Sequence, residues 1–249
     1  MIGQPRKVQV LTSGQSNQTL RLITDTQDYV LKRWQHQRLF AVDRELEVTV
    51  QKQLAKKALA PEIIDYHLEQ GWLLQPYYAA PSLQQVTLSP SIKATVLAEM
   101  LSKIHSTPID IPAWSMAERV EHYLQQLQLV DSSLATTLRE QLLPMKPLLE
   151  DWLSYPVLCH NDLSMNHILM TDPIRVIDWE YAGIGHPLFD IASTIKINQL
   201  SHEMAERLIA DYEQLTHYQI DQAHLAQWCE FVEWLNEVWQ HLFRHASLK

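Results

Sequence analysis

Residues 158–190 decide the fold, and they read LCHNDLSMNHILMTDPIRVIDWEYAGIGHPLFD. The stretch begins with an apolar run and a His-x-Asp pattern that ends at Asp162. Two further apolar runs flank a Thr-Asp-Pro turn, and the second of them ends at Asp178. This pattern predicts two short strands joined by a tight turn, with polar residues at their ends. Such a hairpin directs Asp162 and Asp178 into one cleft.

Two carboxylates in one cleft suit phosphoryl transfer from a nucleotide. One carboxylate orients the attacking hydroxyl, and the other holds magnesium on the phosphates. Protein kinases place an asparagine five residues after the aspartate of His-x-Asp, before a strand that ends in the metal-binding aspartate. Here the fifth position after Asp162 is His167, and Asn166 lies one residue earlier. The competing interpretation, two buried strands with solvated carboxylates at their ends, is disfavoured by the length and order of the motif.

The same stretch resembles the aminoglycoside phosphotransferase and choline kinase superfamily, which are small-molecule kinases with a protein-kinase-like fold. Residues 160–163 (HNDL) and 177–183 (IDWEYAG) are most similar to its choline, ethanolamine and thiamine kinase branch. The resemblance is specific from 158 to 192 and loose in the N-terminal third. Two positions depart from it, His167 and His186, where relatives usually have asparagine and aspartate. Similar macrolide and some aminoglycoside kinases also carry histidine at the first position, and the resemblance implies a structural role for the second, so the departures do not exclude activity.

The resemblance implies the cofactors ATP and Mg2+ and a role for each residue of the motif. Asp162 would be the catalytic base. Asp178 would bind the metal together with His167 or Asn166, because a neutral imidazole nitrogen can replace an amide oxygen as a ligand. The family register favours His167. Two residues would support the catalytic loop: His160 and Asp190.

Length and composition set limits on the class of protein. The chain has 249 residues, 46% of them hydrophobic, which is enough for one or two domains. Its net charge of −9 argues against a nucleic-acid partner and suits a cationic substrate. Two cysteines do not make a disulfide framework. Without a signal-like apolar segment or a membrane span, we expect a cytoplasmic protein with no membrane partner.

The N-terminal third predicts a small antiparallel sheet. Strands are expected at 8–11, 19–24 and 29–34, because these runs are rich in β-branched and aromatic residues. A polar loop at 12–18 joins the first two strands, and its backbone amides could cover phosphate oxygens. A plain surface hairpin is the alternative for the loop alone. Its position resembles the nucleotide loop of choline kinase relatives, which implies cofactor-binding roles for Gly14, Ser16 and Asn17.

Lys32 lies in the third predicted strand, where it resembles the kinase lysine that binds the α and β phosphates. A solvated edge charge is the ordinary alternative. On the predicted helix 43–59, Glu47 lies about 60° and Glu45 about 140° from the centre of the apolar stripe. Glu47 therefore borders the buried side and is the predicted partner of Lys32. Arg44 and Glu47 also match the Arg-x-x-Glu spacing of the family.

A further strand pair is expected at 63–66 and 72–74. The resemblance then implies a hinge between lobes, in which Gln75 and Tyr77 bind the adenine through their backbone. Beyond it the sequence becomes helical. Helices are expected from the N-cap Ser89 to about residue 104, from a capping box that begins at Ser115, over 133–152, and from Asp190 to the end.

The resemblance implies an aromatic pocket for a cationic group. Glu180 and Tyr181 follow the metal-binding aspartate, and the C-terminal helix carries Trp234 and Trp239. A cation over a Trp or Tyr face gains about 0.5–2 kcal/mol. The alternative is that the aromatic stripe of this helix, at helical spacing, is simply core.

Together these observations predict a two-lobed, kinase-like α+β fold, with a nucleotide-binding lobe at 1–75 and a mostly helical substrate lobe at 76–249. The expected reaction is transfer of the γ-phosphoryl group of ATP to the hydroxyl of a small cationic alcohol: choline, ethanolamine or thiamine. Two alternatives stay open. An aminoglycoside kinase would use carboxylates of the C-terminal helix, namely Glu230, Glu233 and Glu237. A kinase-like binding protein would lack catalysis, because of the histidine at position 167. The sequence does not give the oligomeric state.

Overall fold

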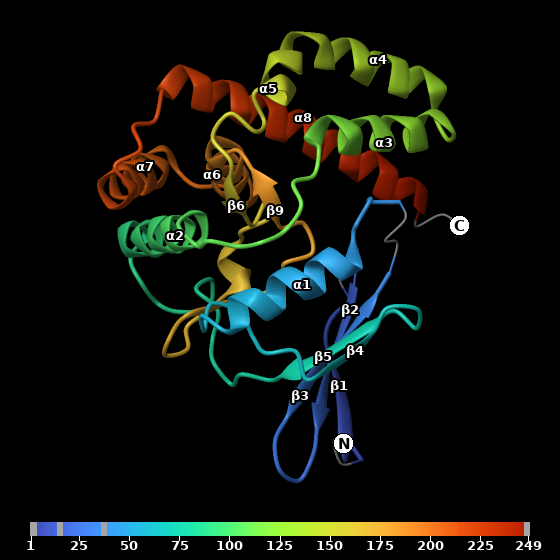
Figure 1. Cartoon of the computed structure of the whole chain (residues 1–249), viewed down its shortest axis with the longest axis vertical. Helices are drawn as coiled ribbons and strands as arrows, with labels where there is room; N and C mark the ends of the chain where they lie inside the picture. The colour runs from blue at the N-terminus through green and yellow to red at the C-terminus, as the bar shows by residue number, and fades with distance from the viewer. Residues whose placement is uncertain (1–3, 14–16, 36–38, 247–249) are drawn as a thin grey trace. The chain divides into compact units, whose positions relative to one another are not determined.

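The computed structural model describes residues 4–13, 17–35 and 39–246. The chain forms two compact units, and Figure 1 labels most of their helices and strands. Unit 1 contains residues 1–84 and 166–180, and unit 2 contains residues 85–165 and 181–249. The first unit thus extends past the predicted boundary at Gln75 and includes the hairpin that follows the His-x-Asp motif. The assignment of nucleotide and substrate to separate lobes stays a prediction.

Unit 1 is built on the predicted antiparallel sheet, with strand order β1-β2-β3-β5-β4. Its strands are β1 (Lys7–Ser13), β2 (Asn17–Ile23), β3 (Tyr29–Trp34), β4 (Asp65–His67) and β5 (Trp72–Pro76). The register places Lys32 of β3 between Thr19 of β2 and Leu73 of β5. Lys32 therefore lies on a central strand, and the edge-charge alternative is excluded.

One helix, α1 (Arg44–Ala55), packs on this sheet through a cluster of Val48, Trp34 and Leu73. Asp43 caps its N-terminus by accepting hydrogen bonds from the next backbone amides. The helix ends four residues before the predicted Leu59, so the predicted length was wrong. The reason is a turn that Ala58 closes with φ +55°, a conformation that a helix cannot continue through.

The predicted hairpin is present and consists of β7 (Ile168–Leu169) and β8 (Arg175–Val176). Backbone hydrogen bonds hold both strands within unit 1. Leu83 N–H donates to Ile168 O at 2.8 Å, and Val176 N–H donates to Leu59 O at 2.8 Å. This anchoring fixes the segment that leads into Asp178.

Unit 2 is mostly helical. Its elements are α2 (Pro90–His105), α3 (Met116–Gln128), α4 (Ser132–Leu142), the 3-10 turn η1 (Leu143–Met145), α5 (Lys146–Glu150), β6 (Val157–Cys159), β9 (Gly183–Gly185), α6 (Pro187–Ile197), α7 (His202–Thr216) and α8 (Gln222–Ala246). The 3-10 turn η2 (Met165–His167) lies where the chain passes from unit 2 to unit 1. The N-caps Ser89 and Ser115 are confirmed. The single helix predicted over 133–152 was wrong, because Pro144 interrupts the backbone hydrogen bonding between α4 and α5.

Aromatic rings fill the core of unit 2. Trp228 of α8 contacts Trp152 and Phe189 edge-on, with centroids 6.2 and 5.9 Å apart.

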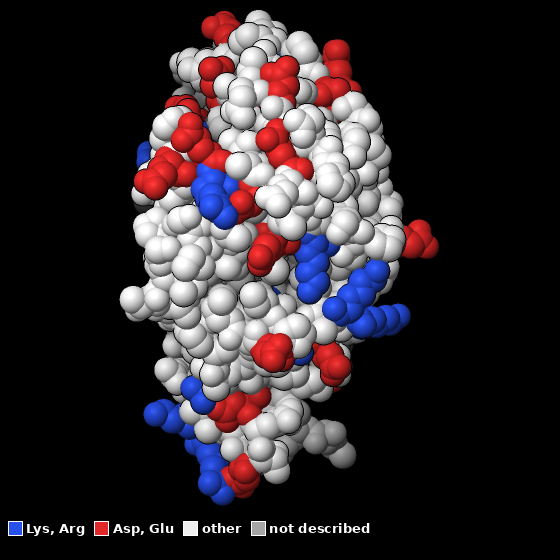
Figure 2. Space-filling view, turned by 90° about the vertical axis from the view of Figure 1, so that its left-hand side faces the viewer, with Lys and Arg blue, Asp and Glu red and all other residues white. Residues whose placement is uncertain are grey.

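No helix in the described part of the chain is long and apolar enough to cross a membrane. The face drawn in Figure 2 carries side chains of both charges, separated by broad uncharged areas.

Candidate active site

The centre of unit 1 is an ion pair between Lys32 of β3 and Glu47 of α1, as the helical spacing predicted. Lys32 Nζ donates to Glu47 Oε1 at 2.7 Å and also contacts the carboxylate of Asp178. Burial opposes the charge of Lys32, but Asp178, Glu47 and Glu180 outweigh it and raise the pKa of this lysine above its ordinary value. The lysine is therefore charged throughout the physiological pH range, as a phosphate-binding group must be.

A second cation, Arg44, completes this network. Its Nη1 lies 2.6 Å from Glu47 Oε2 and 2.7 Å from Glu180 Oε2, and its Nη2 donates to Asn17 Oδ1 at 3.1 Å. Asn17 in turn donates to Glu180 at 2.6 Å. These side chains are almost fully buried, and although burial lowers the pKa of Arg44, its two carboxylates raise it overall. Arg44 thus holds Glu47, its partner in the Arg-x-x-Glu pattern, and Glu47 orients Lys32.

Asp178 follows β8 in a left-handed conformation, with φ +70°. Aspartate tolerates this region better than most residues, and such strain is concentrated at functional sites. His167 Nε2 lies 3.6 Å from Asp178 Oδ2, whereas Asn166 Oδ1 accepts from Ser82 Oγ at 3.5 Å. His167 therefore lies beside Asp178, and the choice between His167 and Asn166 as the metal ligand stays a prediction. A carboxylate that shares its metal with water and phosphate oxygens is ordinary Mg2+ chemistry, so Asp178 fits this ion.

Some residues of unit 1 that were predicted to bind cofactor or substrate contact other protein groups in the structure. The carboxylate of Glu180 is buried against Arg44 and Asn17, so it belongs to the ion-pair network and does not face an open substrate surface. The Tyr77 amide donates to Asp28 O at 2.9 Å, so it is not open to an adenine ring. The Gln75 side chain accepts from Gln51, and the backbone contact with adenine expected for Gln75 stays a prediction. Gly14 and Ser16 lie outside the described residues.

In unit 2, the loop of residues 160–165 carries Asp162, and helix α6 holds its first half. Asp190 accepts from the backbone amides of His160 and Asn161 at 2.7 and 2.8 Å. Ser193, one turn later, donates to Asn161 O at 2.9 Å. Asn161 has φ +65°, another left-handed residue beside the proposed catalytic group. The role predicted for Asp190 therefore has a direct geometric basis, and His160 takes part through its backbone and through Nδ1, which accepts from Asp162 N–H at 3.3 Å.

Asn198, at the C-terminal end of the same helix, holds the second half of the loop. Its Nδ2 donates to Leu163 O at 2.9 Å and to Thr194 O at 2.8 Å, and its Oδ1 accepts from Met165 N–H at 2.7 Å. The loop is thus fixed on both sides of Asp162 by side chains of one rigid helix. Sequence reasoning missed Asn198, because an asparagine at a helix end is ordinarily only a cap.

Asp190 also anchors a buried polar cluster. His105 Nε2 lies 3.1 Å from Asp190 Oδ2, and the other ring nitrogen lies 2.7 Å from the Tyr212 hydroxyl. Cys159 lies close to His105 and Asp190, and the ligand atoms of these three residues are near enough to one another to hold a metal ion. Burial raises the pKa of the Cys159 thiol, however, and the Asp190 oxygens already accept hydrogen bonds from backbone amides. The cluster is therefore a hydrogen-bonded support for the loop.

The aromatic residues predicted to bind the substrate are engaged with other groups. The guanidinium of Arg119 lies 4.0 Å from the ring centroid of Trp114 and 5.8 Å from that of Tyr181. Trp234 is buried and donates to Leu138 O at 3.2 Å, so the core interpretation holds for this residue. Trp239 stacks on Phe243, with centroids 5.7 Å apart. Nothing in the sequence pointed to Arg119.

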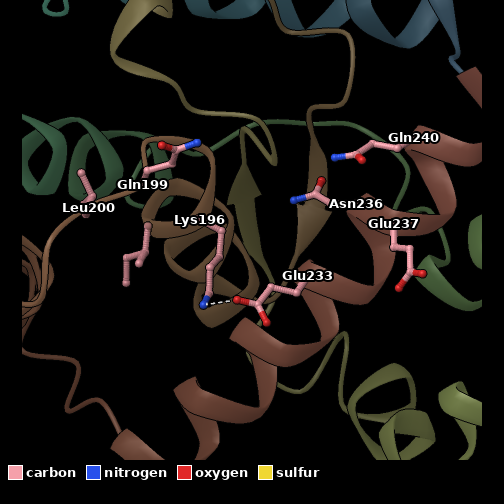
Figure 3. Close-up of a pocket in the computed structure, with 8 residues that line it drawn as sticks. Lys196, Gln199, Leu200, Glu233, Asn236, Glu237 and Gln240 are labelled. Carbon is pink, nitrogen blue, oxygen red and sulfur yellow. Dashed lines mark hydrogen bonds and ion pairs between the residues drawn. The ribbon is translucent and has the colours of Figure 1, made fainter. Parts of the chain in front are cut away.

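An open cavity of about 580 Å³ lies between α6 and α8 of unit 2, and Figure 3 shows its walls. From α6 and the segment after it come Ile195, Lys196, Gln199 and Leu200; from α8 come Glu233, Asn236, Glu237 and Gln240. Two of the three glutamates considered for the aminoglycoside alternative therefore line it.

Comparison with known proteins identifies the family. Residues 7–231 match the phosphotransferase enzyme family (APH). The chain belongs to this family. The choline kinase LicA of Streptococcus pneumoniae has a similar structure, with a TM-score of 0.81 over 99% of this chain and 88% of that chain at 17% identity. The two-lobed kinase-like fold predicted from the sequence is thus confirmed.

Curated relatives are similar over shorter stretches. The protein LicA of Haemophilus influenzae is 49% identical over 55 residues, which are 22% of this chain and 21% of LicA. The choline/ethanolamine kinase of Mus musculus is 26% identical over 157 residues, which are 56% of this chain and 39% of that enzyme. The matches therefore span well under half the length of these relatives.

Proposed function

We propose that this chain is an ATP-dependent kinase that phosphorylates the hydroxyl of a small cationic alcohol of the choline and ethanolamine type. The observation that carries the proposal is the placement of Lys32 between Glu47 and Asp178 in unit 1. A charged lysine beside a metal-binding carboxylate suits the polyphosphate of a nucleotide. The similarity to choline/ethanolamine kinases supports the substrate class.

Each residue has a proposed role in this reaction. Lys32, held by Glu47, binds the α and β phosphates, and Asp178 with His167 holds Mg2+, which neutralises charge on the phosphates. Asp162 orients the acceptor hydroxyl and takes its proton. Asp190 positions the loop of Asp162. Accordingly, unit 1 would bind the nucleotide and unit 2 the alcohol.

The test is ATP consumption by the purified chain against choline, ethanolamine, thiamine and an aminoglycoside, with Lys32→Met as the inactive control. We expect turnover with at least one of the first two alcohols and its loss in the control. Turnover with the aminoglycoside alone would favour the alternative of an aminoglycoside kinase, in which Glu233 and Glu237 would bind the substrate. Nucleotide binding without turnover would favour a kinase-like binding protein.

A further inference from the structure

One cation of unit 2 is held by aromatic rings. The Arg119 guanidinium, in the first turn of α3, lies 4.0 Å from the ring centroid of Trp114 and 5.8 Å from that of Tyr181. Among the described residues, no carboxylate forms an ion pair with Arg119. The N-terminal end of a helix also carries a partial positive charge, which disfavours a cation there. The position of this guanidinium therefore depends on the two aromatic rings.

Tyr181 is fixed beside the loop that carries Asp162, within unit 2. Asn161, the residue before Asp162, donates from Nδ2 to Tyr181 O at 2.8 Å. The backbone amide of the same asparagine is held by Asp190 at 2.8 Å. Because these bonds join the backbone of Tyr181 to the loop, its ring lies within the length of one side chain from the loop.

Trp114 is fixed on the strand pair that leads into the same loop. Gly183 of β9 pairs with Cys159 of β6, the last residue of that strand. A Cβ at Gly183 would lie 1.7 Å from Trp114 Nε1, so the N–H edge of the indole packs directly on β9. Trp152 also packs against the indole, with centroids 5.1 Å apart. A second cation that is to bind the face beside Arg119 must therefore take the place of this guanidinium.

The aromatic rings and the cations impose the same condition. A cation gains from a Trp or Tyr face when it lies within about 6 Å of the ring centroid, and this condition is the same for a guanidinium and for the ammonium group of an alcohol. Two cations at one ring also repel each other. Arg119 is only partly buried, so rotation of its long side chain is enough to clear the rings.

We propose that Arg119 is a resident cation at the acceptor site, and that a cationic alcohol binds the faces of Trp114 and Tyr181 only after this guanidinium has moved away. Arg119 thus acts as an internal competitor and sets the KM for the acceptor. The inference rests on the proposed kinase function and adds to it a residue that regulates the affinity of the same site.

The first test measures the binding of tetramethylammonium to the full chain without nucleotide, by calorimetry. This probe carries a positive charge but no hydroxyl and no N–H, so it reports on the aromatic faces alone. We expect Arg119→Met to bind it about 3- to 30-fold more tightly than the wild type, because the variant keeps the apolar stem and removes the competing charge. Arg119→Lys keeps a cation within reach of the rings and should bind it like the wild type. Unchanged or weaker binding in Arg119→Met, or no binding to either protein, overturns the inference.

Two further variants separate the aromatic site from net charge. Arg207→Met removes the same charge from α7, where Arg207 pairs with Asp211, and it should leave the dissociation constant unchanged. Adding Tyr181→Leu to Arg119→Met should cancel most of the gain. An equal gain in Arg207→Met, or a gain that survives the loss of the Tyr181 ring in full, overturns the inference.

Turnover distinguishes this inference from the proposed function. With choline as the acceptor, Arg119→Met should lower KM for choline about 3- to 30-fold and keep KM for ATP within about twofold of the wild type. A KM for choline that stays the same or rises overturns the inference and leaves the kinase function intact. Absence of turnover in both proteins, together with tighter binding of tetramethylammonium by Arg119→Met, overturns the proposed function and leaves the internal competitor in place.

Discussion

Replacing Asn198 by alanine removes three hydrogen bonds, of 2.9, 2.8 and 2.7 Å, two of which fix the backbone around Asp162. A typical intramolecular hydrogen bond contributes about 0.5–1.5 kcal/mol net, so the loss of three should lower the free energy of unfolding of Asn198→Ala by about 1.5–4.5 kcal/mol. The variant should also lower turnover, because a displacement of the Asp162 loop by about 1 Å can reduce turnover about 100-fold. We therefore expect kcat to fall about 10- to 100-fold, with KM for ATP within about twofold of the wild type.

The assay compares steady-state kinetics and urea unfolding of Asn198→Ala with those of Thr216→Val. Thr216 is the matched control, because its hydroxyl makes local hydrogen bonds at the end of α7. Thr216→Val should lose stability and keep kcat. If Asn198→Ala keeps the wild-type kcat, or if Thr216→Val loses kcat equally, Asn198 stabilises the fold without positioning Asp162.

Three further predictions concern the ion-pair network, the cap of α6 and the metal. Arg44→Met should destabilise the protein by about 3–5 kcal/mol in chemical unfolding, because it removes the cation that two buried carboxylates share and leaves Glu47 with Lys32 and Glu180 with Asn17; a loss below about 1 kcal/mol would contradict this. Burial lowers the pKa of His186 from 6.5 to about 4, so the unfolded chain binds its proton first, and stability should fall by about 1–3 kcal/mol as the pH drops through that range. His186 is the N-cap of α6, where its Nδ1 accepts from Leu188 N–H at 3.1 Å. His186→Asn keeps an N-cap and should reduce this acid-side slope, and an unchanged slope would exclude His186 as its source. Titration with magnesium should show a higher requirement in His167→Ala than in Asn166→Ala, and the reverse order would make Asn166 the ligand.

The sheet, the hairpin and the caps could be predicted because local chemistry determines them. Serine at positions 89 and 115 has the same capping role in the sequence pattern and in the structure. The end of α1 could not be predicted, because Ala58 adopts a positive φ, which alanine rarely does. The break at Pro144 carried a clear signal, since proline cannot donate the backbone hydrogen bond that a continuous helix needs.

The charged residues of the site were easier to predict than its substrate side. The resemblance implied Lys32 as the phosphate-binding lysine, helical periodicity selected Glu47 as its partner, and the structure shows the pair directly. The aromatic residues were harder, because a tryptophan at helical spacing looks the same whether it faces a ligand or, like Trp234, the core. Asn198 and Arg119 act through contacts with residues distant in sequence, which periodicity does not reveal.

The most direct test of the proposed reaction is the turnover of Asp162→Asn with the alcohol that gives the highest kcat/KM. A general base contributes about 10²–10⁴-fold, and asparagine keeps the shape of the side chain while removing its capacity to take a proton. We predict that kcat falls within this range, while the dissociation constant for ATP, measured by calorimetry, stays within about twofold of the wild type. The control Asp131→Asn, a substitution between two good N-cap residues at α4, should leave both values unchanged. Near-normal turnover of Asp162→Asn would contradict the assignment of Asp162 as the base.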